Sequence, residues 1–179
     1  MRVLAISGSL RRGSYNSALL GAAAAECPHA EFVVWRGLAD IPAYDEDLDL
    51  VPPAVAELRD EIARSDAVLI ATPEYNASVP GALKNALDWA SRPFATNALR
   101  NKPVAVIGAS QGLFGAVWAQ ADLRRVLATI GARVDDRELP VARAHEAFTA
   151  DGRLRDPGLA TILRAIVDDL ICRTAQRAA

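Results

Sequence analysis

Serine, arginine and asparagine side chains are concentrated in residues 8–16, GSLRRGSYN, directly after the apolar run of residues 3–6. The two glycines are spaced as in the phosphate loop G-x-x-x-x-G-K-[ST] of nucleoside-triphosphate enzymes, but Ser14 stands where that loop has its lysine. A triphosphate with Mg²⁺ needs that lysine, whereas hydroxyl groups, backbone N–H groups and one guanidinium suit a single phosphate monoester. The stretch therefore predicts a monophosphate site. A plain turn with a serine cap and two solvated arginines is the alternative.

A second polar stretch, PEYNASVP, runs from Pro73 to Pro80 and follows another apolar run. Pro73 ends that run, and Pro80 opens a helical pattern, as proline does at a first helical position. Between them, Glu74, Tyr75 and Asn76 offer polar groups beside an aromatic ring. This combination suits the edge of a flat heteroaromatic ligand. An ordinary turn containing asparagine is the alternative.

A third stretch, GASQGLFG, matches the nucleophile elbow G-x-S-x-G of α/β-hydrolases, with Ser110 as the nucleophile. Acidic residues and then His145 follow, in the chain order of a Ser–acid–His hydrolase. A helical pattern that starts only near Gly115 argues against the elbow, as does the crowding of acid and histidine within one βα unit. The other interpretation is a glycine-rich loop that closes over a ligand, with Ser110 and backbone N–H groups as donors.

Composition and charge argue against several classes of function. The 179 residues have a formal net charge of −2 with mixed signs along the chain, so they lack the basic patch of a nucleic-acid partner. No window reaches the roughly 18 apolar residues of a membrane helix. The two histidines and two cysteines are too scattered for a metal site, and YDEDLDL lacks the glycine and glutamate of an EF-hand loop. Cys27 and Cys172 are interpreted as thiols of a cytoplasmic protein.

Apolar runs alternate with amphipathic stretches, and this order predicts the elements that position the three loops. Strands are predicted at residues 2–7, 31–35, 67–71, 103–108 and 132–134, with helices between them. The first helix begins near residues 14–16, Gly131 caps the fourth, and Arg173 and Arg177 lie near the end of the last. A single domain of β-α repeats over residues 1–179 indicates a three-layer α/β sandwich. In such a sheet, ligands bind beyond the carboxyl ends of the strands, which the three loops follow.

Taken together, GSLRRGSYN and PEYNASVPGALKNALDW resemble the NAD(P)H-dependent FMN reductase family, a flavodoxin-like group that includes quinone, chromate and azo-dye reductases. The resemblance runs over nearly the whole chain. It implies a flavodoxin-like sandwich whose five parallel strands have the order 2-1-3-4-5, one bound FMN, and association into a homodimer or homotetramer. It also implies an oxidoreductase in which hydride passes from NADPH or NADH through the bound flavin, in a ping-pong scheme, to quinones, flavins or another small-molecule electron acceptor.

The resemblance also assigns cofactor-binding residues to the three loops. The residues for the FMN phosphate are Ser9, Arg11, Asn16 and Ser17, with Ser14 as a further contact. The residues along the isoalloxazine edge, largely through backbone atoms, are Pro73, Glu74, Tyr75 and Asn76, and those on the other side of the ring are Ser110 and Gly112. No catalytic side chain is expected, because the flavin itself carries the hydride.

Two questions remain open from the sequence. A flavodoxin-type electron carrier shares the fold, but such carriers are usually more acidic than this chain and enclose the flavin with aromatic rings, whereas Tyr75 is the only aromatic residue of its loop. Arg12 is either a surface charge or a contact for the phosphate of the nicotinamide nucleotide.

Overall fold

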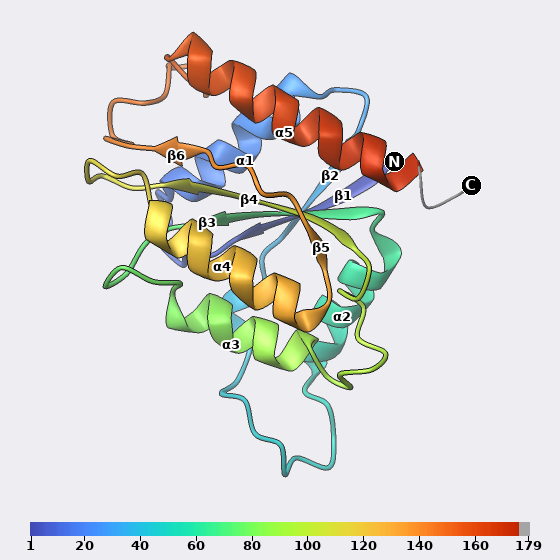
Figure 1. The fold of residues 1–179 in the computed structure, drawn as a ribbon. Helices are drawn as coiled ribbons and strands as arrows, with labels where there is room; N and C mark the ends of the chain where they lie inside the picture. Colours follow the sequence, from blue (N-terminus) through green and yellow to red (C-terminus); the bar gives the residue numbers. More distant parts are fainter. Residues whose placement is uncertain (176–179) are drawn as a thin grey trace.

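A parallel sheet lies at the centre of the chain, of which the computed structural model describes residues 1–175 (Figure 1). The strands β1 (Arg2–Ser7), β2 (Glu31–Trp35), β3 (Ala67–Thr72), β4 (Pro103–Ala109) and β5 (Arg133–Val134) have the order β2-β1-β3-β4-β5. This flavodoxin-like order was expected from the resemblance and is confirmed. The first and last residues predicted for these five strands each agree with the observed bounds to within one residue.

Helices cover both faces of the sheet. α1 (Tyr15–Glu26) and α5 (Pro157–Ala175) lie on one face, and α2 (Pro53–Arg64), α3 (Gly81–Ala90) and α4 (Val117–Ile130) lie on the other (Figure 1). Side chains alternate along β1, so that Val3 and Ala5 join the core under α1 and α5 while Leu4 and Ile6 join the opposite core. The strand is therefore apolar throughout because both of its faces are buried.

One strand is not predicted from the sequence. β6 (Pro140–Val141) pairs with the last residues of β4, whereas β5 pairs with the first, so the edge strand is in two pieces. Between them, the buried carboxylate of Asp135 accepts the backbone N–H of Arg137 at 2.9 Å, which turns the chain away from the sheet. The buried amide of Gln120 then binds both backbone groups of Leu139, at 3.2 Å each, and returns the chain to β4.

Local residue types explain the ends of α1 and α4. The Ser14 hydroxyl caps α1 by accepting the Ser17 N–H at 3.2 Å, and Gly131 ends α4 with φ 100°. Both ends agree with the prediction. The expected start of α4 near Gly115 is two residues early, because Gly115 and Ala116 have left-handed backbone, with φ 59° and 61°.

Two further expectations concern α3 and α5. Pro80 precedes α3 as its cap residue, one position earlier than predicted. Arg173 lies in the last turn of α5 and pairs with Asp169 at 2.9 Å, whereas Arg177 lies outside the described residues. Across the described part of the chain, no helix has both the length and the apolar character needed to span a membrane.

The carboxyl ends of β1, β3 and β4 lie side by side, and the loops that follow them meet at this edge. Gly8, at the end of β1, donates its N–H to the Ala71 carbonyl of β3 at 2.8 Å. A Cβ at position 8 would lie 2.8 Å from Cδ2 of Leu83, so a larger residue would require this side chain to shift where the first loop crosses the start of α3.

Candidate functional site

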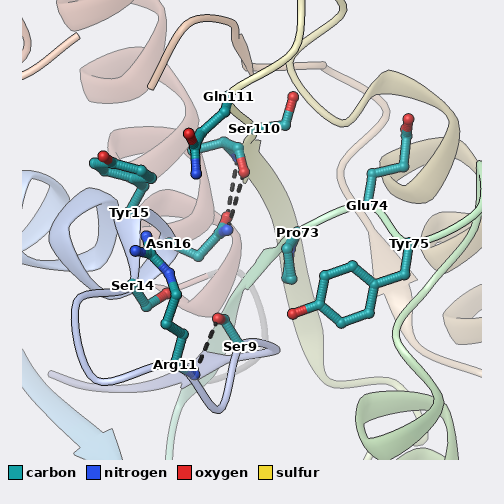
Figure 2. Close-up of a pocket in the computed structure, with 11 residues that line it drawn as sticks. Ser9, Arg11, Ser14, Tyr15, Asn16, Pro73, Glu74, Tyr75, Ser110 and Gln111 are labelled. Atoms are coloured by element: carbon teal, nitrogen blue, oxygen red, sulfur yellow. Dashed lines mark hydrogen bonds between the residues drawn. The ribbon is translucent and has the colours of Figure 1, made fainter. Parts of the chain in front are cut away.

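The three loops enclose a cavity of about 290 Å³ at the carboxyl edge of the sheet (Figure 2). Its lining combines the β1–α1 loop, the β3–α3 loop and the end of β4, and comprises Ser9, Arg11, Ser14, Tyr15, Asn16, Pro73, Glu74, Tyr75, Ala109, Ser110 and Gln111. Seven of the ten residues expected at a cofactor site are in this lining. Ser17, Asn76 and Gly112 lie outside it.

The β1–α1 loop supplies hydrogen-bond donors and one positive charge. The backbone N–H groups of residues 13–16 have no acceptor within residues 1–175, because they precede or open α1. The Arg11 guanidinium lies over the Tyr15 ring, 4.8 Å from its centroid, and makes no ion pair with any described carboxylate. Free N–H groups at a helix N-terminus beside an unpaired guanidinium form an anion site.

Asn16 has a structural role that the sequence does not predict. Its side-chain amide accepts the N–H of Ala109 at 2.9 Å and donates to the carbonyl of the same residue at 3.0 Å (Figure 2). Asn16 is buried, so this pair of hydrogen bonds ties the first turn of α1 to the end of β4. The amide thereby fixes the distance between the first and third loops.

Ser17 lies beyond the phosphate loop, on the side of a second cavity. Its hydroxyl is 3.1 Å from the hydroxyl of Ser7 at the end of β1. Both serines line this second cavity, together with Arg12, and neither lines the first.

The β3–α3 loop is a tight two-residue hairpin. Tyr75 and Ser78 exchange both backbone hydrogen bonds at 3.1 Å, with Asn76 and Ala77 at the tip in left-handed backbone, φ 53° and 60°. The Ser78 hydroxyl donates to the Asp122 carboxylate of α4 at 2.8 Å. Tyr75 is 52 % exposed and forms part of the cavity wall, while Asn76, at the tip, is exposed and does not line the cavity.

Glu74 caps α4. Its carboxylate accepts the N–H groups of Trp118 and Ala119 at 3.0 and 3.1 Å, at a helix start where Ala116 provides no side-chain cap. Both hydrogen bonds go to Oε2, so the Glu74 carboxylate has a structural role at the start of α4. The resemblance assigned Glu74 to the edge of the isoalloxazine ring, mainly through its backbone atoms. Its side chain instead binds the first N–H groups of α4.

The β4–α4 loop does not form a hydrolase site. Ser110 donates its backbone N–H to Val141 of β6 at 3.0 Å, and Gly112 accepts the Arg143 N–H at 3.0 Å. His145 is exposed and pairs with Glu146 at 3.2 Å, and within residues 1–175 no hydrogen bond joins it to Ser110. The Ser–acid–His arrangement suggested by chain order is therefore not assembled.

Three lining residues, Tyr15, Ala109 and Gln111, were not expected from the sequence. The ring of Tyr15 stacks on that of Phe148, with the two planes within 3°, and its own face contacts the Arg11 guanidinium. Gln111 follows Ser110 at the rim of the cavity. The place of Tyr15 in the first helical turn, one residue before Asn16, is the only sequence signal that could have indicated its role.

Comparison with known proteins agrees with this geometry. The family model described as NADPH-dependent FMN reductase matches residues 1–146. The chain belongs to this family. An NAD(P)H-dependent FMN reductase of Pseudomonas aeruginosa is 45 % identical over 159 residues, which is 87 % of this chain and 85 % of the relative. A 2-hydroxy-1,4-benzoquinone reductase of a Burkholderia species is 36 % identical over 170 residues, 94 % and 93 % of the two chains.

The fold of this FMN reductase family member also matches a solved relative. FerB, a flavoenzyme NAD(P)H:(acceptor) oxidoreductase from Paracoccus denitrificans, superimposes with a TM-score of 0.86 at 39 % identity, covering 98 % of this chain and 97 % of the other. Membership of this family confirms that the chain is an FMN- and NAD(P)H-dependent oxidoreductase, as the motifs GSLRRGSYN and PEYNASVPGALKNALDW predicted. The electron-carrier alternative is accordingly set aside.

Proposed function

We propose that the chain binds FMN in the cavity of about 290 Å³ and passes hydride from a nicotinamide nucleotide to quinones or other small acceptors. The observation that carries this proposal is the donor set of the β1–α1 loop. One guanidinium, the Ser9 hydroxyl and four consecutive free N–H groups suit one phosphate dianion, and the lining that residues 1–175 form has no lysine and no acidic cluster for a triphosphate with magnesium.

Each predicted site residue has a separate part in this proposal. Ser9 and Arg11 hold the phosphate directly, while Asn16 and Ser17 hold the loop in position through Ala109 and Ser7. On the ring side, Pro73 and Tyr75 form one wall, and Glu74 and Asn76 set the path of the hairpin backbone. Ser110 and Gly112 form the opposite loop.

Bound FMN would supply the chemistry by accepting hydride from a nicotinamide and releasing it to an acceptor. The protein residues then have three tasks, which are to bind the phosphate, to orient the ring and to leave one face accessible. Among the described residues, the lining contains no histidine, lysine or cysteine, and its one carboxylate caps α4, so the proposal assigns no proton transfer to a side chain. Donor and acceptor use the same open face in turn, which gives ping-pong kinetics.

Quinones are the proposed acceptors. Relatives that cover most of this chain are named quinone reductases, including one of Pseudomonas putida that is 38 % identical over 171 residues. The half-exposed Tyr75 offers an aromatic surface to a planar ring, and the two charged side chains of the lining, Arg11 and Glu74, have other parts in this proposal, at the phosphate and at the start of α4. A range of quinones and free flavins therefore fits the site.

Further parts of the proposal concern the whole chain. The two cores lie on the two faces of one sheet, which supports a single FMN-binding domain over residues 1–179. Leu113, Phe114 and Trp118 are exposed apolar residues beside the site, which supports a homodimer or homotetramer that covers them. Free thiols at Cys27 and Cys172 support a cytoplasmic location.

The test begins with the colour of the purified protein and titration with FMN. Arg11→Ala should weaken FMN binding by roughly 1–3 kcal/mol, the loss of one charge-assisted hydrogen bond. Arg155→Ala is the matched control, because Arg155 is exposed, makes no ion pair among the described residues and lies outside the cavity. A protein that stays colourless with FMN refutes the cofactor assignment.

The reaction is tested under argon. NADPH or NADH should bleach the flavin absorbance, 1,4-benzoquinone should restore it, and double-reciprocal plots at several quinone concentrations should be parallel. Flavin that binds but is not bleached would identify an electron carrier instead. Intersecting plots would refute the shared open face.

A further inference from the structure

The second cavity, of about 250 Å³, lies on the β2 side of the phosphate loop. Its lining consists of Ser7, Ser9, Leu10, Arg11, Arg12, Ser17, Val34, Trp35, Arg36, Leu38 and Ala39. Ser9 and Arg11 line both cavities, so the two share a wall. An occupant of the second cavity would therefore lie beside the proposed FMN phosphate without displacing it.

Of the residues that the structure describes, three arginines line this cavity and no aspartate or glutamate does. Most other arginines of the described chain are bound to an acidic side chain or a carbonyl, as Arg137 is to Asp135 and Asp169. Arg12 and Arg36 have no such partner within residues 1–175 and are exposed. In a chain of net charge −2, this unpaired positive charge is a local concentration that fits an anion.

The rest of the cavity selects the kind of anion. One wall is formed by Val34, Trp35, Leu38 and Ala39, from the end of β2 and the 3₁₀ helix η1 (Gly37–Asp40). A Cβ at position 37 would lie 2.7 Å from the Trp35 ring, so glycine lets η1 begin directly against the indole. An apolar wall opposite guanidinium and hydroxyl groups suits a phosphorylated nucleoside better than an inorganic ion.

The size of the cavity limits how much of such a ligand it takes. Pockets that enclose a whole drug-sized molecule typically measure about 300–1,000 Å³. The second cavity, of about 250 Å³, therefore holds one phosphorylated end of a longer dinucleotide, just as the first, of about 290 Å³, holds FMN only in part. The proposed function requires one such nucleotide, the nicotinamide donor, and only its NADPH form carries a phosphate monoester on a ribose in addition to the pyrophosphate.

We propose that Arg12 and Arg36 bind the 2′-phosphate of NADPH in this second cavity and thereby select NADPH over NADH. This inference rests on the proposed function. Arg11, between the two cavities, neutralises part of the repulsion between this phosphate and the FMN phosphate. Arg12 then has a binding role distinct from that of its neighbour in the same loop.

The first test compares the two donors on the FMN-loaded enzyme with 1,4-benzoquinone as acceptor. The wild-type kcat/KM should be at least about tenfold higher with NADPH than with NADH, and the variant carrying Arg12→Ala and Arg36→Ala should lose most of that ratio. Arg12→Lys should retain part of it, because the charge remains. Arg155→Ala, which removes an exposed and unpaired arginine elsewhere, should leave the ratio unchanged.

The second test uses the wild-type enzyme alone and probes the phosphate directly. Adenosine 2′-monophosphate should inhibit competitively against NADPH, and adenosine 5′-monophosphate and inorganic phosphate should be at least about tenfold weaker. Equal inhibition by all three would overturn the inference, because the cavity would then be a general anion site. Inhibition by none would also overturn it.

Other outcomes separate this inference from the proposed function. Equal use of NADPH and NADH by an enzyme that keeps its FMN overturns only the phosphate assignment. Loss of FMN from the double variant also overturns it, since Arg12 and Arg36 would then belong to the cofactor site. Failure of both donors to reduce the wild-type flavin contradicts the proposed function itself.

Discussion

Replacement of Asn16 by alanine tests whether this residue holds the loops together or only contacts a ligand. The side-chain amide makes two hydrogen bonds, of 2.9 and 3.0 Å, to the two backbone groups of Ala109, which is 2 % exposed. A buried donor or acceptor left unpaired costs about 1–3 kcal/mol, so the loss of both hydrogen bonds would cost about 2–6 kcal/mol. Water entering from the adjacent cavity can replace part of this, which gives an expected loss of about 2–4 kcal/mol.

The assay is urea unfolding of flavin-free protein, followed by circular dichroism, so that cofactor binding does not contribute to the measured stability. Ser9→Ala is the matched control. Ser9 lines the same cavity, but its hydroxyl accepts only a 3.4 Å hydrogen bond from the Arg11 N–H, and its replacement should change the free energy of unfolding by less than about 0.5 kcal/mol. If the flavin-free Asn16→Ala variant is as stable as Ser9→Ala, the hydrogen bonds between Asn16 and Ala109 do not hold the two loops together, and the structural role of Asn16 is refuted.

Two further predictions concern α4 and the thiols. Glu74→Ala should lower the free energy of unfolding by about 1–2 kcal/mol, because the N–H groups of Trp118 and Ala119 lose their cap. Glu74→Gln should retain most of the wild-type stability, because the amide oxygen can still accept. Urea unfolding of the two variants checks this, and equal losses of stability would contradict the cap. Burial, assisted by the neighbouring Asp168, raises the pKa of the Cys27 thiol from 9.0 to about 11. Because only the thiolate reacts, iodoacetamide at pH 8 should label the exposed Cys172 and leave Cys27 unmodified in the folded protein. Mass spectrometry of the peptides measures both modifications, and labelling of the two cysteines at similar rates would contradict this prediction.

The sheet was predictable because its central strands are buried on both faces. Continuous apolar runs such as residues 103–108 have few alternatives in a chain that also contains amphipathic stretches of helical period. The β6 strand was not predictable. It depends on Gln120, a polar residue of α4 that looks solvent-facing in the sequence but is fully buried and binds Leu139.

The location of the site was predictable for a similar reason, since the three loops share one edge of the sheet. The part played by each side chain was not. Asn16 and Glu74 are polar residues next to a predicted ligand, and the sequence cannot distinguish a side chain that contacts the ligand from one that caps a helix or joins two loops. Only the partners, Ala109 and the start of α4, separate these roles.

The hairpin of residues 75–78 is attached to α4 at both ends, by Glu74 on one side and by Ser78 with Asp122 on the other. For protein engineering, the hairpin and the first two turns of α4 are therefore one transferable module. Acceptor specificity taken from a relative should be moved as residues 73–79 together with residues 116–122. A hairpin grafted alone would arrive without the N–H groups and the carboxylate that hold it in place.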